Sequence, residues 1–314
     1  MALTSLHKKL LRVALALAVI VFCIFFFRTI DWPKLGKAVA EARWQLVALA
    51  AAVNFIHLLA KAGRWGVLLS PVGRVGLLPL FRYTLGGYAA SNILPARFGE
   101  VLRVFYLRPH GIPAAGAAGV QVLEKVYEVV GLMVLLVPLP FVLELPPAAS
   151  KTIGVVVAGG LIAVAVMGWM ALHHRIPRQG LLARIGEGMA VLRRPREALL
   201  ALGLSVLVWC LDAVEVMLVM AAVGLPPGFF AALLVLLFVN FAIAAPSTPA
   251  QVGIFEAGAV FALHKILGAP LEASLAFALL YHFMQAIPVT LAGLEALVLW
   301  RSLRAVPAAD GKLP

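Results

Sequence analysis

The residues best suited to chemistry in this sequence are ionisable side chains inside long apolar stretches. They form four sets, which are Arg97, Glu100 and Arg103; Glu124, Lys125 and Glu128; Asp212 and Glu215; and Glu256 with Asn240 and Gln251. A charge at the centre of a bilayer costs at least about 2.5–3.5 kcal/mol on insertion scales, so such groups persist when they are paired or line a hydrated cavity. Each set is therefore a candidate binding or proton-transfer site.

The first set follows a break in an apolar stretch. Arg97, Glu100 and Arg103 recur every third residue, which places them along one side of a helix that begins after Pro95. A helix that begins at membrane depth points unsatisfied N–H groups and the positive end of its dipole into a cavity. With Arg97 beside it, this helix start predicts a phosphate cradle, and the alternative is an Arg–Glu pair that only closes the hairpin.

The second and third sets each place two acids one helical turn apart. Glu124 and Glu128 share a face, and Lys125 can neutralise one of them, so structural pairing and pathway lining stay equal alternatives. Asp212 and Glu215 repel each other, so at least one of them requires a cationic partner or an added proton. The pair of Asp212 and Glu215 indicates either a proton relay or packing against a basic residue of another helix.

The fourth set surrounds a second break. Glu256 follows Pro246 and Pro249, with Asn240 upstream and Gln251 nearby. A carboxylate behind an unwound segment suits a headgroup amine, a cation or a proton.

Another predicted helix has a polar face. Its polar residues are separated by 3, 4 and 3 positions and are Asn54, His57, Lys61 and Arg64. Its two cations are expected to snorkel to lipid phosphates, and its Asn and His to form hydrogen bonds between helices. His282 and Gln285 in the last apolar stretch are open to the same structural interpretation or to a pathway role.

Recognisable catalytic signatures are absent from the sequence. There is no HExxH, GxSxG, Walker loop, GxGxxG or CxxC motif. The three aspartates, Asp31, Asp212 and Asp310, are too far apart for an Asp-x-Asp metal site, and His173-His174 lies on a basic loop. We therefore expect no cofactor and no metal, and a transporter is favoured over an enzyme.

Composition places these residues in an integral membrane protein. Of the 314 residues 63% are apolar and only 13% charged, which excludes soluble enzymes, secreted disulfide scaffolds, disordered proteins and nucleic-acid-binding domains. The net charge of +12 is scattered between apolar stretches, which indicates loops facing anionic lipid and no nucleic-acid partner. Cys23 and Cys210 both lie in hydrophobic runs and indicate neither a disulfide nor a zinc site.

Six segments are long enough to cross a bilayer, which takes roughly 20 residues. They are 1–28, about 45–64, 116–143, 152–172, 198–222 and 273–300, within a single integral membrane domain of residues 1–314. The first segment reads as a retained helix, because Phe27-Arg28-Thr29 stands where a signal peptide would have a small-residue cleavage site.

Two further apolar stretches, 77–107 and 229–266, are broken near their centres by Pro, Gly and polar residues. The segment 173–197 carries six arginines against two glutamates, so it is expected in the cytoplasm with both basic termini. Six full spans satisfy this orientation when both broken stretches are re-entrant hairpins. The all-α fold is therefore predicted to have six transmembrane helices and two re-entrant hairpins.

This arrangement places residues 28–44 outside the cytoplasm, against the charge rule. We expect that segment to form a surface helix anchored at the interface by Trp32 and Trp44. Apolar residues at helical spacing among arginines over 181–192 predict an amphipathic helix on the cytoplasmic surface.

The two hairpins share a local pattern and would enter from opposite membrane faces. Pro95-Ala-x-x-Gly99 precedes Glu100, and Pro249-Ala-x-x-Gly253 precedes Glu256. Opposed copies of one pattern indicate an inverted repeat, which many transporters arrange around a site at the bilayer midplane.

At these hairpins the sequence resembles the transmembrane region of the lysylphosphatidylglycerol synthase/flippase family. The matching stretches are 92–103, 122–125 and 246–256, and with the hydropathy the likeness covers about residues 43–300. The family often has Gly after the motif prolines and Glu-Arg in the middle stretch, where this chain has Ala96, Ala250 and Glu124-Lys125.

The resemblance implies a flippase-like lipid transporter without the soluble synthase domain, for which no room is expected after Trp300. Its substrate would be a phosphate-bearing membrane lipid of the bacterial inner membrane: a phospholipid, an aminoacyl-phospholipid or a polyprenyl- or hopanoid-type lipid. The expected headgroup and transport pathway comprises the charged sets above with Asn92, Pro95, Gly99, Pro246, Pro249 and Gly253. The alternative is a membrane enzyme, or an accessory partner of one, in lipid or glycolipid biosynthesis.

Overall fold

The protein is described by a computed structural model that covers residues 31–94, 98–143, 188–244 and 249–304, with scattered positions between 147 and 162. Regular structure within these residues is entirely helical, as predicted. Several expectations fall outside the described residues. They concern the first span 1–28, most of 152–172, the loop up to residue 187, Pro95, Arg97 and Pro246.

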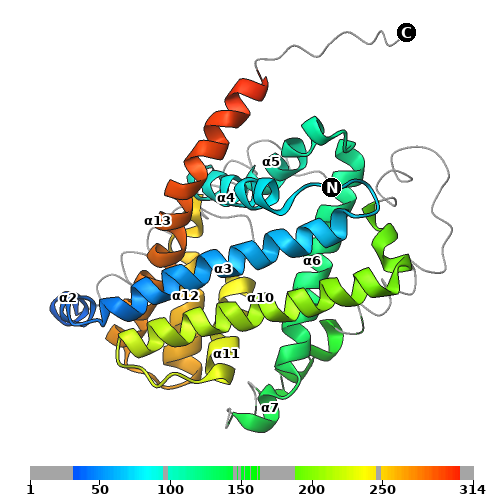
Figure 1. Cartoon of the computed structure of the whole chain (residues 1–314). Helices are drawn as coiled ribbons and strands as arrows, with labels where there is room; N and C mark the ends of the chain where they lie inside the picture. Colours follow the sequence, from blue (N-terminus) through cyan, green and yellow to red (C-terminus); the bar gives the residue numbers. More distant parts are fainter. Residues whose placement is uncertain are drawn as a thin grey trace, which may run out of the picture.

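Among the described residues, three helices are long and apolar enough to cross a membrane, in agreement with three of the predicted spans. They lie at Trp44–Leu69 (α3), Pro195–Ala222 (α10) and Leu271–Val298 of the longer α13 (Leu271–Arg304). Figure 1 shows α3 and α10 running side by side, with α6 (Ala114–Leu136) crossing them. These helices identify a membrane-embedded protein.

Each broken stretch folds as two helices packed against each other. The first consists of α4 (Leu77–Ile93) and α5 (Phe98–Tyr106). The second consists of α11 (Phe229–Ile243) and α12 (Ile254–Val260), and α12 continues into the π-helical turn η4 (Phe261–Ile266). We call these pairs hairpin one and hairpin two. Both breaks fall in the Pro- and Gly-containing runs that predicted them.

Glycine allows the two arms of hairpin one to touch. A Cβ atom on Gly99 of α5 would lie 1.7 Å from the carbonyl oxygen of Gly87 in α4 and 2.5 Å from the hydroxyl of Ser91. Hairpin two is packed in a similar way, because a Cβ atom on Gly258 would lie 2.8 Å from the carbonyl oxygen of Phe238. Gly99 is therefore required for the packing of hairpin one, independently of any role in a transport pathway.

The predicted surface helix is present as α2 (Trp32–Ala40). Asp31 caps it by accepting a hydrogen bond from the N–H of Lys34 at 3.2 Å, and its carboxylate pairs with the Lys34 ammonium at 3.0 Å. These contacts hold the pKa of Asp31 below its ordinary value. The exposed fractions of Trp32 and Trp44 are 53% and 52%, which fits two rings at a membrane interface.

Arg43, between α2 and α3, binds the end of α10. Its backbone N–H donates to the carbonyl of Ala222 at 2.9 Å, and its guanidinium donates to the carbonyl of Ala221. A cation that binds the last carbonyls of α10 also meets the negative end of that helix dipole. The charge of Arg43 therefore stabilises the end of α10.

The core surrounds α11, whose residues are all apolar except Asn240 and are largely buried. Leu233, Leu234 and Val235 have no exposed surface, and Leu236 and Leu237 have almost none. Such a helix lies inside a protein. The described fold also includes short helical turns: η1 (Arg108–His110), α7 (Leu139–Val142), η2 (Ala190–Arg193) and η3 (Pro249–Gln251).

The substitution Gly99→Ala tests the packing of hairpin one. The added methyl group overlaps the backbone of α4, so we expect the free energy of unfolding to fall by about 1–3 kcal/mol. Thermal melting in detergent measures this loss. The matched control is Gly203→Ala in α10, where a Cβ atom meets nothing within 4 Å and stability should not fall. Equal melting temperatures for Gly99→Ala and the native protein would contradict the packing.

Candidate functional site

A cavity of about 200 Å³ lies between the two hairpins and the long helices. Predicted site residues on its wall are Asn92, Gly99, Glu100, Arg103, Lys125, Glu128 and Asp212. Three more predicted residues, Glu124, Glu215 and Glu256, each contact a side chain of that wall. The structure thus brings together members of all four sets.

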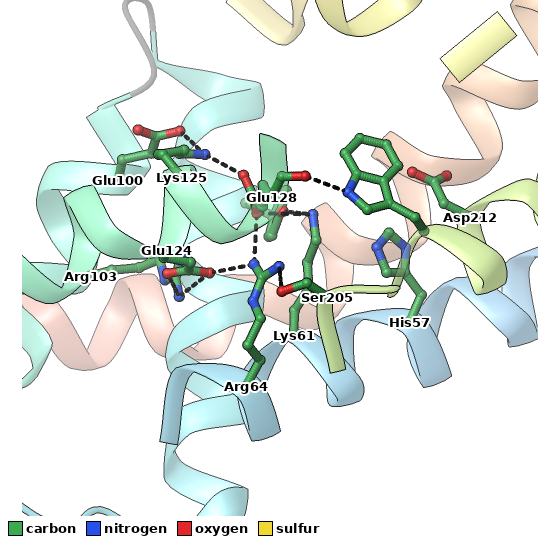
Figure 2. A network of polar contacts seen from close by, with 12 residues as sticks. His57, Lys61, Arg64, Glu100, Arg103, Glu124, Lys125, Glu128, Ser205 and Asp212 are labelled. Atoms are coloured by element: carbon green, nitrogen blue, oxygen red, sulfur yellow. Dashed lines mark hydrogen bonds and ion pairs between the residues drawn. The ribbon is translucent and has the colours of Figure 1, made fainter. Parts of the chain in front are cut away.

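One wall is an ion-pair network centred on Arg64 (Figure 2). Its Nη2 donates to Glu128 Oε1 at 2.9 Å and to Glu124 Oε1 at 3.2 Å, and its Nη1 donates to Ser205 Oγ at 3.2 Å. Arg64 has no exposed surface. The expectation that it snorkels to lipid phosphates is therefore wrong, because carboxylates inside the protein satisfy its charge.

Arg103 adds a second guanidinium to the same network. Its Nη2 donates to both oxygens of Glu124 at 3.0 and 3.3 Å, and the guanidinium lies 4.1 Å above the ring of Trp65. Glu124 therefore joins Arg103 of α5 to Arg64 of α3. Through Glu124, the Arg103 side chain ties hairpin one to α6.

Two lysines complete the network at the cavity. Lys125 Nζ lies 2.9 Å from Glu100 and 3.2 Å from Glu128, so it pairs with one of the two neighbouring acids, as predicted, and also reaches hairpin one. Lys61 donates to the hydroxyl of Tyr88 at 2.7 Å and lies 3.7 Å from Glu128. Both lysines line the cavity, so Lys61 also faces the protein interior.

This network carries an excess of positive charge. Among the described residues its four cations, on Lys61, Arg64, Arg103 and Lys125, meet three carboxylates, on Glu100, Glu124 and Glu128. Four minus three leaves one positive charge. In a medium of low polarity an unmatched charge attracts a counter-ion, and here that ion would be an anion.

A second cluster lies farther along α10 and carries the acids Asp212 and Glu215. His57 Nδ1 lies 3.1 Å from Glu215 Oε1, so the basic partner expected from another helix is a histidine. Tyr281 donates its hydroxyl to Asp212 Oδ1 at 2.6 Å. Gln285 donates to Asp212 Oδ1 and to Glu215 Oε2, both at 3.3 Å. Two acids therefore share one neutral amide.

The same cluster is the arrangement within the described residues that could hold a metal ion. One ligand atom each from His57, Asp212 and Glu215 lies within 4.8 Å of the others, and all three residues are buried. Imidazole and carboxylate donors suit a transition metal such as Zn²⁺. Hydrogen bonds from Tyr281 and Gln285 also stabilise the two carboxylates without an ion.

A third cluster links hairpin two to α13. His282 Nδ1 lies 2.6 Å from Glu256 Oε1, and His282 Nε2 lies 2.8 Å from the carbonyl oxygen of Ala250. The second oxygen of Glu256 accepts the N–H of Gly253 at 2.7 Å. Ala250 and Gln251 have left-handed backbones, with φ of 52° and 63°, which costs on the order of 1–3 kcal/mol for each residue.

Two of the predicted polar residues serve packing. Asn92 donates to Thr290 Oγ1 at 2.9 Å and to the carbonyl of Ala286 at 3.3 Å, so it fastens hairpin one to α13. Asn240 donates to the carbonyl of Leu236 in its own helix at 2.8 Å, although it also lines the cavity.

Sequence reasoning missed three functional partners, which are Tyr88, Ser205 and Tyr281. Each is a single uncharged polar residue in a mostly apolar helix, so no spacing distinguishes it from ordinary packing residues. His282 carried a weak signal, because it lies one turn before Gln285 in a predicted span.

A family model described as the lysylphosphatidylglycerol synthase TM region matches residues 10–293. The chain belongs to this family. Among curated proteins none matches the chain significantly. The family match confirms the resemblance seen in the two hairpins and extends it over nearly the whole chain. It identifies a membrane protein with a lipid-related function.

The substitution Arg64→Gln tests the central ion-pair network. It leaves Glu124 and Glu128 with less compensation, so we expect the free energy of unfolding to fall by about 3–5 kcal/mol. Thermal melting in detergent measures the loss. Lys34→Gln removes an exposed cation from α2 and serves as the control, with no change expected. A native melting temperature for Arg64→Gln would show that the network does not support the fold.

Proposed function

We propose that the protein is a flippase-like transporter that moves a phosphate-bearing lipid across the membrane, with the headgroup in the cavity between the hairpins. The observation that carries the proposal is the positive excess of the ion-pair network beside the cavity. Three of the network's cations, on Lys61, Arg103 and Lys125, line the cavity together with two of its carboxylates, on Glu100 and Glu128. A phosphodiester brings one negative charge, which matches the single positive charge left by the network.

The remaining wall suits the apolar part of a lipid. Leu58, Leu236, Val239, Ile243 and Val289 line the same cavity as the three cations. A site that offers fixed charge on one side and aliphatic surface on the other accommodates a headgroup together with the start of its chains. Inorganic phosphate alone would leave the aliphatic surface unused.

The acidic clusters would make the proposed site selective among lipid headgroups. Asp212 lies on the cavity wall across from the network, and Glu256 lies behind His282. An aminoacyl-phospholipid would place its amine toward Asp212 and its phosphate toward Lys125. Phospholipids without an amine and polyprenyl- or hopanoid-type lipids with a phosphate remain within the proposed class.

The proposed transport architecture has six spans, two re-entrant hairpins from opposite faces and both termini in the cytoplasm of a bacterium. Two exposed cations at the open end of hairpin one, the end away from its tip, support this architecture. They are Arg74, before α4, and Arg108, after α5, and the charge rule expects such residues on the cytoplasmic side. The family match and the apolar helices support the membrane setting. Rocking of two inverted repeats would expose the cavity to each side in turn.

A membrane enzyme of lipid biosynthesis is the second candidate. The observation in its favour is the buried group of His57, Asp212 and Glu215, which could hold a catalytic metal. Incubation of the purified protein with lipid donors and divalent cations would then yield a product of changed mass.

The transport proposal is tested by lipid movement in proteoliposomes. The probes are an anionic phospholipid, an aminoacylated phospholipid and a polyprenyl phosphate. Lys125→Gln removes the positive excess, so we expect at least about a tenfold loss of movement, equivalent to 1.4 kcal/mol of headgroup binding. The matched control is Lys37→Gln on α2, which should move lipid like the native protein.

Two results would contradict the proposal. One is undiminished movement by Lys125→Gln, which would show that headgroup binding does not depend on the positive excess. The other is no movement of any probe by native protein with a native melting curve, which would shift the weight to the enzyme or accessory-partner candidates.

The proposed topology is tested with single cysteines at the open ends of the hairpins. The background has both native cysteines replaced by alanine, and the test positions are Arg74, Arg108, Pro227 and Lys265. An impermeant thiol reagent should label the first two positions only from the cytoplasm and the last two only from the opposite side. Labelling the two ends of one hairpin from different sides would show a single crossing in place of a re-entrant hairpin.

A further inference from the structure

The contact between Glu256 and His282 requires one proton more than a carboxylate and a neutral imidazole contain. His282 Nε2 lies 2.8 Å from the carbonyl oxygen of Ala250, which can only accept a hydrogen bond, so this nitrogen carries a hydrogen. In a neutral ring Nδ1 is then bare. It lies 2.6 Å from Glu256 Oε1, and a bare nitrogen facing an ionised oxygen at that distance is repulsive.

Neighbouring groups prevent the pair from avoiding this conflict by turning. Glu256 Oε2 is held by the N–H of Gly253 at 2.7 Å, so the carboxylate is fixed at both oxygens. The His282 ring stacks on Phe255, with 4.4 Å between centroids. The exposed fraction of His282 is only 5%, so the ring has little room to turn.

We propose that Glu256 and His282 bind a single proton that locks the tip of hairpin two, and that release of this proton unlocks the tip. The ligand of the site is the proton itself, shared along the line between Nδ1 and Oε1. Its use as the coupling ion of lipid movement rests on the proposed function, whereas the binding of the proton does not.

The tip needs a lock because its backbone is strained. Ala250 and Gln251 are left-handed without being glycine, and Gly253 has a φ of 89°. Among the described contacts that restrain this segment are a hydrogen bond from His282 to Ala250 and one from Gly253 to Glu256. Both end on the pair that shares the proton, so separating the pair loosens the tip.

The proton has a route to water. His282, Ala250 and Gln251 line the cavity, while Glu256 lies behind them. On release, the Nδ1–H bond breaks and the proton passes to a water molecule as hydronium. A neutral imidazole and a carboxylate remain, and their facing lone pairs push the side chains apart.

Several other titratable groups on elements packed against α13 have partners of their own. The groups on these elements are His57, Lys61 and Arg64 of α3, Arg82, Tyr83 and Tyr88 of α4, Arg196, Glu197, Cys210, Asp212 and Glu215 of α10, Lys34 and Lys37 of α2 with Glu41 directly after it, and His264 and Lys265 of η4. Within the described residues, Asp212 and Glu215 bind Tyr281, Gln285 and His57, and Lys61 binds Tyr88. His264 contacts the carbonyl of Ala269. The proton between Glu256 and His282 is thus a local event.

Hydrogen exchange of the full chain in nanodiscs tests the proposal. Amide exchange in 249–256 is followed from mildly acidic to mildly alkaline buffer and corrected for the intrinsic effect of pH. Opening that releases one proton becomes about tenfold more favourable per pH unit, so exchange at the tip should accelerate by that factor above the midpoint. Corrected exchange that does not vary with pH in the native protein would overturn the proposal.

Two variants separate the proton from other causes. Glu256→Gln keeps the shape, and its amide can donate to bare Nδ1 while its carbonyl accepts the Gly253 N–H, so the tip should stay protected at every pH. Glu295→Gln changes an exposed acid of α13 and should keep the native pH dependence. A native pH dependence in Glu256→Gln would overturn the proposal. The native pH dependence in a protein that moves no lipid would uphold the proton site and remove transport alone.

Discussion

A guanidinium sealed from water holds the centre of this protein together. Arg64 binds carboxylates of α6 and a hydroxyl of α10, so three helices must meet at one register for its charge to be compensated. Apolar helix faces in a membrane slide past one another with little penalty, whereas a buried unpaired charge is costly. The ion-pair network therefore specifies which packing of these helices is allowed.

The cavity takes its character from that network. Its arginines pair with Glu124 and Glu128 on one side, while Asp212 and Glu215 are bound by neutral donors and a histidine. Charge is thus separated across a small space enclosed by otherwise apolar helices. Both hairpin tips border this space, so a movement of either tip changes what the charges face.

Positions of the candidate site were predictable from sequence, but their partners were not. A charge such as Glu124 or Asp212 stands out in an apolar stretch, because membrane insertion penalises it. The partner of each charge depends on how distant helices pack. Arg64 illustrates the limit, since its place near a helix end predicts a lipid-facing side chain and its true neighbours come from helices much later in the chain.

Breaks in the hairpins were predictable for a local reason, because Pro and Gly disfavour helix wherever they occur. The surface helix α2 followed from its length and tryptophans. The contact of His282 with Glu256 was not predictable, since nothing in a spacing of 26 residues indicates that a π-helical turn and a strained tip will bring the two together.

The contact between Arg43 and the end of α10 has a consequence for the synthesis and membrane insertion of the protein. The carbonyl that its guanidinium binds lies 178 residues later in the chain. At a synthesis rate of about 5–20 residues per second, that partner emerges roughly 10–35 s after Arg43. During that interval the arginine is an unpaired cation at the edge of a newly inserted helix, exposed to the insertion machinery and to lipid headgroups. The end of α10 then supplies the carbonyl that binds the Arg43 guanidinium. This contact between the start of α3 and the end of α10 therefore forms only after the later helices have been inserted.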